Sequence, residues 1–168
     1  MITVRHSELS DLEAIKTIYQ QEHAYSNTLQ LPFQSNELWE KRLTTFSDNN
    51  INLVALIDEQ VVGQLALQVM DRPRRKHVAT LGMGVSSAHR GKGVGSQLLS
   101  AAIDLADNWL NIRRVELEVY KSNEAAICLY QKHGFVEEGL MRDYAFTHGE
   151  YVDALMMARL RGQPSNEA

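Results

Sequence analysis

A short segment that is both basic and rich in glycine offers the most specific chemistry in the chain. It reads VSSAHRGKGVG and holds two cations and three glycines, Arg90, Gly91, Lys92, Gly93 and Gly95. Glycines let the backbone turn tightly, so that successive N–H groups at the start of a helix point at an anion, and the cations attract a polyanion locally. The spacing matches neither the phosphate-loop motif of kinases nor the dinucleotide motif GxGxxG. The segment therefore predicts a phosphate-binding turn, with a turn that binds nothing as the alternative.

Apolar periodicity predicts the elements that must hold this turn. Strands are expected at residues 2–6, 51–58, 61–70, 77–85, 113–120, 135–147 and 150–160. Helices are expected after a capping box of Ser10 and Glu13, after Ser35 or Asn36, from the glycine segment to Trp109, and over residues 123–133. The remaining stretch at 23–36 has no clean period and contains Pro32, which indicates a loop.

The order of these elements predicts a mixed α/β sheet with helices on both faces. The turn lies between the strand at 77–85 and a helix, and the strand at 113–120 follows that helix. Such a strand, crossover helix and strand favour a parallel or splayed pair with a right-handed connection. Gly82 and Gly84 inside the first strand of this unit are expected to mark a β-bulge, or else a simple bend.

Length and composition describe one ordinary globular domain. The 168 residues are 44% apolar and 23% charged, so we expect a single domain over 1–160 and a flexible tail over 161–168. Seventeen Lys and Arg against 21 Asp and Glu leave a net charge of −4, the wrong sign for a protein whose main task is to neutralise nucleic-acid phosphates. The basic loop at 72–76 is expected to be a solvated hairpin tip.

Cysteine and histidine usage excludes several classes of site. The single cysteine, Cys128, cannot form an intramolecular disulfide and is expected to be a small core residue. The six histidines show no metal-ligand spacing. No apolar run reaches the roughly 18 residues of a membrane span, and the charged beginning of the chain is unlike a signal peptide. We expect a cytoplasmic protein with no nucleic-acid, membrane or metal partner.

The segments RGKGVG at 90–95 and NEAAICLYQKHGF at 123–135 carry a family resemblance. The first is similar to the R/Q-x-x-G-x-G/A pyrophosphate loop of the GNAT superfamily of acetyl-CoA-dependent N-acetyltransferases, and the second is similar to its next signature. RPRRKHVA, DNWL and GEYVDALMMAR resemble the bacterial L-amino-acid N-acetyltransferase subgroup. The resemblance spans nearly the whole chain. It implies a GNAT-like, mostly antiparallel sheet with a central splayed strand pair.

The resemblance implies a set of residues that bind acetyl-CoA as cosubstrate. Backbone amides of the turn would hold the pyrophosphate, from Arg90, Gly91, Lys92, Gly93, Val94, Gly95 and Ser96. The strand end before the turn would pair with the pantetheine arm, through Met83, Gly84 and Val85. The helix at 123–133 would add Asn123, Ala126, Tyr130 and Lys132. The alternatives are that Asn123 only caps its helix and that Lys132 is only a solvated surface residue.

The resemblance also implies catalytic roles. Tyr130 lies two helical turns after Asn123 on the same face, which would place its hydroxyl near the thioester sulfur as a general acid, unless it is a core tyrosine with a satisfied hydroxyl. The strand TLGMGV has no carboxylate, although many family members have a glutamate there. Glu118 is the preferred candidate base and Glu116, on the same strand face, is the second, unless both are solvated or salt-bridged surface residues. Weaker candidates are His77, Asp143 and Tyr144, and a water relay needs no single base.

The implied function is transfer of an acetyl group from acetyl-CoA to a primary amine, by direct attack through a tetrahedral intermediate. The subgroup favours a free amino acid, while a polyamine, a protein N-terminus or an amine drug stays open. Candidate substrate contacts are Tyr25, Asn27, Gln30, Tyr144 and Tyr151. A non-catalytic acyl-CoA sensor is the rival hypothesis, because it needs neither Tyr130 nor a base. A homodimer through the C-terminal strands is expected by analogy.

Overall fold

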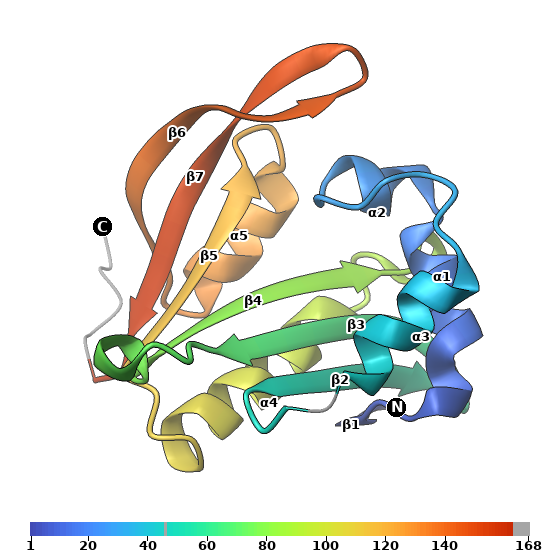
Figure 1. Cartoon of the computed structure of the whole chain (residues 1–168), viewed down its shortest axis with the longest axis horizontal. Helices are drawn as coiled ribbons and strands as arrows, with labels where there is room; N and C mark the ends of the chain where they lie inside the picture. The colour runs from blue at the N-terminus through green and yellow to red at the C-terminus, as the bar shows by residue number, and fades with distance from the viewer. Residues whose placement is uncertain (46, 163–168) are drawn as a thin grey trace.

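The computed structural model describes residues 1–45 and 47–162. Of the predicted tail, Arg161 and Gly162 form a turn, and residues 163–168 lie outside the described part of the chain. The strands are β1 (Ile2–His6), β2 (Asn50–Ile57), β3 (Gln60–Val69), β4 (Val78–Val85), β5 (Arg114–Tyr120), β6 (Val136–Thr147) and β7 (Glu150–Leu160). They form one sheet in the order β1-β2-β3-β4-β5-β7-β6, and every neighbouring pair is antiparallel except β4 with β5 (Figure 1).

Helices cover both faces of this sheet, as predicted. They are α1 (Leu12–Tyr19), α2 (Glu22–Ser26), α3 (Asn36–Thr44), α4 (Val94–Asn108) and α5 (Glu124–Lys132), with short 3-10 turns η1 (Leu9–Asp11), η2 (Pro73–Arg75) and η3 (Ser87–His89). The apolar stripe of α4 packs on β1 to β4 around Leu98 and Leu99, which are both fully buried. On the other face, α1 packs over β3, and α3 packs against α1. Ile15 of α1 and Trp39 of α3 share a buried cluster with Val54 of β2. The apolar periods therefore predicted the two layers correctly.

Two details at the N-terminal end differ from the expectation. The backbone N–H of Glu8 donates to Asp11 Oδ2 at 2.8 Å, so the capping pair is Glu8 with Asp11 and not Ser10 with Glu13. Arg5 on β1 fixes this choice, because its guanidinium donates twice to the Asp11 carboxylate at 2.7 and 2.9 Å. In addition, α2 forms inside the stretch predicted as a loop.

This buried carboxylate makes stability depend on pH. Hydrogen bonding to Arg5 holds the pKa of Asp11 below its ordinary value, against the opposing effect of burial. Since the folded-state pKa is lower than the unfolded value of about 3.9, the stabilisation is complete above that pH and is lost as the pH falls through the folded pKa. We expect Asp11→Asn to cost about 1–3 kcal/mol at pH 7 and progressively less below about pH 4. Urea unfolding of both proteins at several pH values measures this, and a cost independent of pH would contradict it.

The central strands β4 and β5 are paired at one end only. Val78, Ala79 and Thr80 pair with β5, and past Thr80 the two strands diverge (Figure 1). Along its other edge β4 stays paired with β3 as far as Val85. The facing edges of β4 and β5 beyond this point therefore carry backbone N–H and C=O groups with no partner strand. This is the predicted splayed pair.

The β-bulge predicted at Gly82 and Gly84 is wrong. The register between β3 and β4 is regular over its whole length, and the shifts lie instead in the pairs β2–β3 and β6–β7. Gly84 is explained by a close contact, since a Cβ at this position would stand 2.9 Å from the ring of Tyr19. It permits a close approach of α1 to the central strand.

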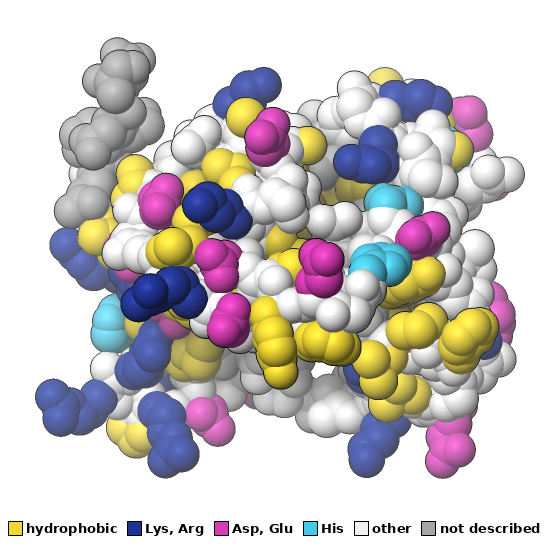
Figure 2. Space-filling view, turned by 90° about the horizontal axis from the view of Figure 1, so that it is seen from above, with side chains coloured by type: hydrophobic (Ala, Val, Ile, Leu, Met, Phe, Trp, Pro, Cys, Tyr) yellow, Lys and Arg dark blue, Asp and Glu magenta, His cyan; other side chains and the backbone are white. Residues whose placement is uncertain are grey.

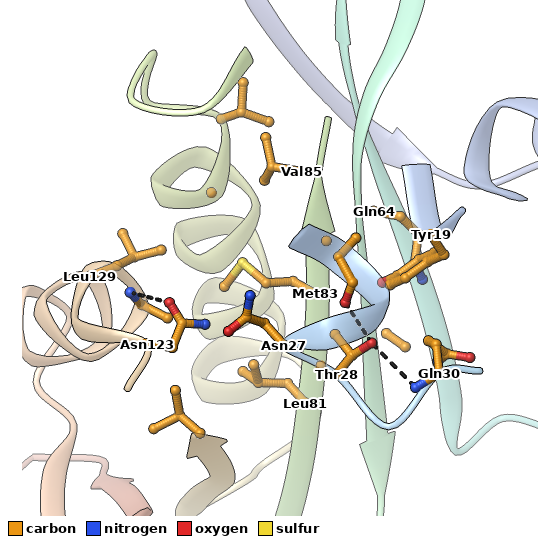
Figure 3. Close-up of a pocket in the computed structure, with 18 of the residues that line it drawn as sticks. Tyr19, Asn27, Thr28, Gln30, Gln64, Leu81, Met83, Val85, Asn123 and Leu129 are labelled. Atoms are coloured by element: carbon orange, nitrogen blue, oxygen red, sulfur yellow. Dashed lines mark hydrogen bonds between the residues drawn. The ribbon is translucent and has the colours of Figure 1, made fainter. Parts of the chain in front are cut away.

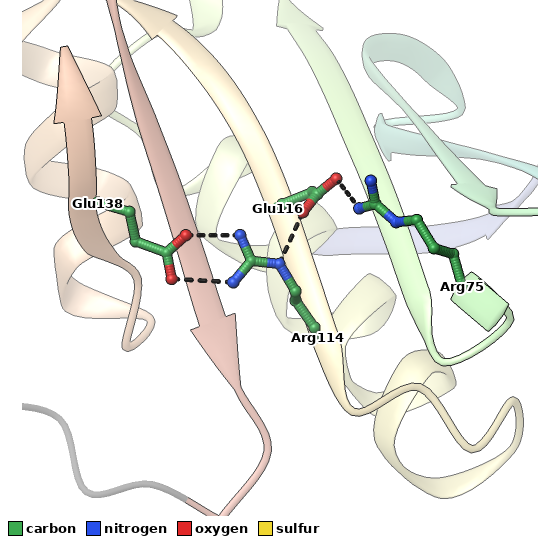
Figure 4. Close-up of polar contacts among 4 residues, drawn as sticks. All are labelled: Arg75, Arg114, Glu116 and Glu138. Atoms are coloured by element: carbon green, nitrogen blue, oxygen red, sulfur yellow. Dashed lines mark hydrogen bonds and ion pairs between the residues drawn. The ribbon is translucent and has the colours of Figure 1, made fainter.

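Ion pairs hold the closed end of the splayed pair together. Arg114 on β5 binds Glu138 on β6 through two hydrogen bonds of 2.9 and 2.5 Å, and its Nε donates to Glu116 at 2.6 Å. Arg75 from η2 adds a bond to the other oxygen of Glu116 at 2.5 Å (Figure 4). The basic loop is thus not only a solvated tip, because one of its arginines is paired. Glu116 is committed to this network.

Candidate active site

The open end of the splayed pair leads into a cleft of ≈ 980 Å³. Leu81, Met83 and Val85 of β4 run through its middle, with Asn123 and Leu129 on one side (Figure 3). Residues of the first helices and β3 lie on the other side, among them Tyr19, Thr28, Gln30 and Gln64. The cleft therefore has one wall built by α4 and α5 and another built by the N-terminal segments.

The structure brings most of the predicted coenzyme residues to this cleft. Its lining includes Met83, Gly84, Val85, Arg90, Gly91, Gly93, Val94, Gly95, Ser96, Asn123, Ala126, Tyr130 and Lys132. Lys92 is the one member of the predicted set outside the lining. Residues from β4, the turn, α4 and α5 are thus gathered along one path.

The glycine-rich turn has the backbone that an anion-binding loop needs. Gly91 and Gly93 have φ values of 71° and 86°, in the left-handed region where side chains are strained. Gly93 is the N-cap of α4, so the first N–H groups of that helix have no intrahelical partner and carry its positive dipole end. Gly95 has another role, since a Cβ there would stand 3.1 Å from Leu129 of α5. These features fit the pyrophosphate of a nucleotide-bearing thioester.

Three buried tyrosines lie along the cleft, and they differ in how their hydroxyls are used. Tyr19 donates to Gln64 Oε1 at 2.6 Å, and Tyr120 donates to the carbonyl of Thr28 at 3.1 Å. Tyr130 is only 7% exposed and packs on Phe135, yet its hydroxyl makes no hydrogen bond within residues 1–45 and 47–162. Burial raises its pKa to about 12, so the phenol stays protonated at neutral pH. It is an unused proton donor facing the cleft.

Asn123 acts as the cap of α5. Its Oδ1 accepts the backbone N–H of Ala126 at 3.3 Å, which is the structural role left open by the sequence. The same side chain also lines the cleft, and its amide NH₂ has no partner among the described residues. Capping therefore orients the amide group and leaves two donors for a ligand.

Comparison with known proteins decides the family. Residues 12–135 match the Acetyltransferase (GNAT) family. The chain is a GNAT acetyltransferase. It is 46% identical to the L-amino acid N-acetyltransferase AaaT of Escherichia coli K12, over 95% of this chain and 98% of the relative. It is 28% identical to the spermidine N(1)-acetyltransferase of Vibrio cholerae, over 99% and 97%.

A solved structure agrees in fold. The GNAT phosphinothricin acetyltransferase of Sinorhizobium meliloti in complex with AcCoA superposes with a TM-score of 0.86, at 24% identity, over 99% of this chain and 94% of that one. The acetyltransferase takes its acetyl group from acetyl-CoA and transfers it to an amine. None of its described helices is long and apolar enough to cross a bilayer.

The two candidate bases of this acetyltransferase have different surroundings. Glu118 lies on β5 beyond the residues that pair with β4. It lines the cleft and forms no ion pair with another described residue. Burial raises the pKa of Tyr144, and the charge of Glu118 raises it further. Both residues line the cleft. Glu116 points into the ion-pair network at the closed end. Of the two, only Glu118 is available to a substrate.

The predicted substrate contacts divide into two groups. Asn27, Gln30 and Tyr144 line the cleft, whereas Tyr25 and Tyr151 do not. Tyr151 is 68% exposed and packs against Phe146, its partner across the β6–β7 hairpin. Tyr25 and Tyr151 belong to segments that border the cleft, but their side chains do not line it.

The prediction for Cys128 is wrong. The side chain is exposed at the edge of the cleft and is not part of the core. On α5 the face that packs inward carries Tyr130, and a residue two positions away points to a different side. The small size of Cys128 and its apolar neighbours in the sequence suggested that it is buried, but the helix period places its side chain on an exposed face.

Several polar residues of the wall formed by the N-terminal segments and β3 were not predicted from the sequence. Gln64 is buried on β3, and its Nε2 donates to Asn52 at 3.2 Å while its Oε1 accepts from Tyr19. A glutamine inside the apolar run VVGQLAL was the available signal, because a buried amide requires partners. His23 of α2 contacts the carbonyl of Val85 at 2.9 Å, which holds this helix over the end of β4.

The β6–β7 hairpin and α2 meet above the cleft. His148 Nε2 lies 3.2 Å from Ser26 Oγ, which joins the hairpin tip to α2. Figure 2 looks down on this side and shows acidic and histidine side chains gathered near the middle of the face. The acceptor end of the cleft is therefore bounded by segments far apart in the chain.

Proposed function

We propose that this acetyltransferase acts on the amino group of a free L-amino acid or a similar small molecule, by direct attack on acetyl-CoA. The observation that carries acetyl transfer from the thioester is the hydroxyl of Tyr130, a buried and protonated donor with no partner among the described residues. The similarity to AaaT over nearly the full length supports the amino acid as acceptor. The predicted residues of the turn, β4 and α5 are proposed to hold acetyl-CoA.

The steps follow from these groups. The unpaired edge of β4 accepts the pantetheine arm, and its free amides stabilise charge on the thioester oxygen. The amine nitrogen attacks the thioester carbon, which forms the C–N bond and a tetrahedral intermediate. As the C–S bond breaks, Tyr130 gives its proton to the leaving sulfur and regains one from solvent. The proton lost by the amine passes to Glu118, directly or through water.

Replacing Glu118 by glutamine tests the proposed base. We expect Glu118→Gln to lower kcat about 100-fold, since general-base catalysis contributes about 10²–10⁴-fold. Glu116→Gln is the matched control, because it removes the same charge from the same strand face outside the cleft. Its kcat should stay within about twofold when the assay runs well below its Tm. An unchanged kcat in Glu118→Gln would assign the proton transfer to water.

A panel of amines tests the proposed acceptor class. Thiol release from acetyl-CoA is measured with free L-amino acids, polyamines and short peptides. We expect the highest kcat/KM with a free L-amino acid. A polyamine or peptide that is better by an order of magnitude would overturn the acceptor proposal. If acetyl-CoA binds but no amine accelerates release, the protein is a sensor and not a catalyst.

Three further proposals concern the location and partners of the enzyme. The sole cysteine of the sequence has no disulfide partner within the chain, which supports the cytoplasm as the place of action. Exposed Leu140, Phe146 and Tyr151 on β6 and β7 support a homodimer through these strands. The acidic net charge supports small amines, and not nucleic acid, as partners.

A further inference from the structure

The charged side chains that line the cleft are unevenly placed. They are Arg42, Arg90, Glu118 and Lys132. Arg90 belongs to the glycine-rich turn and Lys132 to α5, so both cations lie with the proposed coenzyme residues. Arg42 comes from α3, on the wall formed by the N-terminal segments. Among the lining residues it is the single arginine or lysine contributed by that wall.

Arg42 is held in place by neutral groups. Its Cζ lies 4.8 Å from the ring centroid of Trp39, a cation–π contact, and Trp39 is 5% exposed. Its Nη1 donates to Gln30 Oε1 at 2.6 Å and to Gln34 Oε1 at 3.1 Å. In the part of the chain that the structure describes, no carboxylate lies within ion-pair distance of this guanidinium. Its Nη2 and Nε donors are left for an anion from outside.

A stacked chain of side chains connects Arg42 to Tyr19 in the cleft. Trp39 stacks on Tyr19 with ring centroids 5.0 Å apart and an interplanar angle of 21°. Burial raises the pKa of Tyr19 strongly, the Tyr130 hydroxyl raises it further, and the charge of Arg42 lowers it. Tyr19, Tyr130 and Arg42 all line the same cleft. Figure 3 shows Tyr19 and Gln30, the partner of Arg42, on the same side of the cleft.

We propose that Arg42 binds the carboxylate of the acceptor, so that the cleft selects amines that carry a carboxylate close to the amino group. A guanidinium offers paired N–H donors that match a carboxylate, and one with neutral partners alone is free to make that bond. The same charge repels polyamines, whose remaining ammonium groups would approach it. The inference rests on the proposed function and narrows it to α-amino acids.

The test compares an amino acid with its uncharged carboxamide. L-leucine and L-leucinamide have nearly the same size, but only the first has a carboxylate for Arg42. We expect Arg42→Met to lower kcat/KM for L-leucine about 10- to 100-fold, the usual loss for a charge-assisted hydrogen bond, and to leave L-leucinamide within about twofold. The KM for acetyl-CoA should not change. Arg42→Lys, which keeps the charge but loses the planar fork, should retain part of the preference.

Lys41→Met provides the matched control, since it removes a cation from the neighbouring position of the same helix outside the cleft lining. It should leave kcat/KM unchanged for both L-leucine and L-leucinamide. Equal losses on both substrates in Arg42→Met, or no loss on L-leucine, would overturn the inference.

If Arg42→Met does not fold, the role of Arg42 is tested by comparing the two substrates with the wild-type protein. A kcat/KM for L-leucinamide equal to or above that for L-leucine would refute the role of Arg42 and leave amine acetylation intact. If no amine accelerates thiol release, the proposed function itself fails.

Discussion

Replacing Tyr130 with phenylalanine is expected to lower kcat about 100-fold, because a positioned general acid contributes about 10²–10⁴-fold. The change removes one oxygen and keeps the ring that packs on Phe135, so the fold and the acetyl-CoA Kd should be nearly unchanged. Steady-state kinetics with direct measurement of Kd separates the two quantities. A variant with full kcat would remove Tyr130 from the chemistry.

The pH dependence sharpens this prediction. Burial raises the pKa of Tyr130 to about 12, so the phenol stays protonated, and can donate, throughout the neutral range. The wild-type rate should therefore show no decline assignable to this group below about pH 10. Tyr151→Phe is the control, since that exposed tyrosine lies outside the cleft. This substitution should leave kcat and its pH dependence unchanged.

Replacing Gly93 with valine is expected to weaken acetyl-CoA binding at least about 30-fold, since the turn relies on charge-assisted hydrogen bonds that contribute about 1.5–3 kcal/mol each. Gly93 has a φ of 86° at the N-cap of α4, and the nearest atom to a Cβ there is 3.9 Å away. The effect therefore comes from the backbone, which a β-branched residue drives out of the left-handed region. Isothermal titration with acetyl-CoA measures the loss.

Gly149→Val separates this effect from general instability. Gly149 has a φ of 82° in the β6–β7 turn, with open space around it, so the same strain is introduced far from the coenzyme residues. Both variants should lose similar stability, while only Gly93→Val should lose affinity. Equal weakening in both, or undiminished binding in Gly93→Val, would contradict a pyrophosphate role for the turn.

The wall of the cleft that is proposed to bind acetyl-CoA could be predicted from the sequence, because its information is local. The glycines encode backbone angles within a few residues, and the spacing of Asn123 and Tyr130 follows from the helix period alone. The layers of the fold were predictable for the same reason, since each element shows its apolar face in its own sequence.

The acceptor side was not predictable because it is assembled by tertiary packing. Tyr19, Trp39 and Gln64 come from α1, α3 and β3, and no local pattern shows that these three meet. The capping pair of η1, the turn that leads into α1, depends in the same way on Arg5 from β1. In β4 the sequence correctly marked Gly84 as special, but the cause is the ring of Tyr19 and not a bulge.

The central claim is that the cleft passes the acetyl group directly from acetyl-CoA to an amine. Cys128 at the edge of the cleft makes a covalent acetyl-enzyme the natural competitor. Rapid-quench measurement of thiol release, with mass analysis of the intact protein, distinguishes the two. We expect no burst of thiol without an amine, and with L-amino acid present one N-acetylated product for each thiol released. A burst equal to the enzyme concentration, with an acetyl group on the protein, would contradict direct transfer.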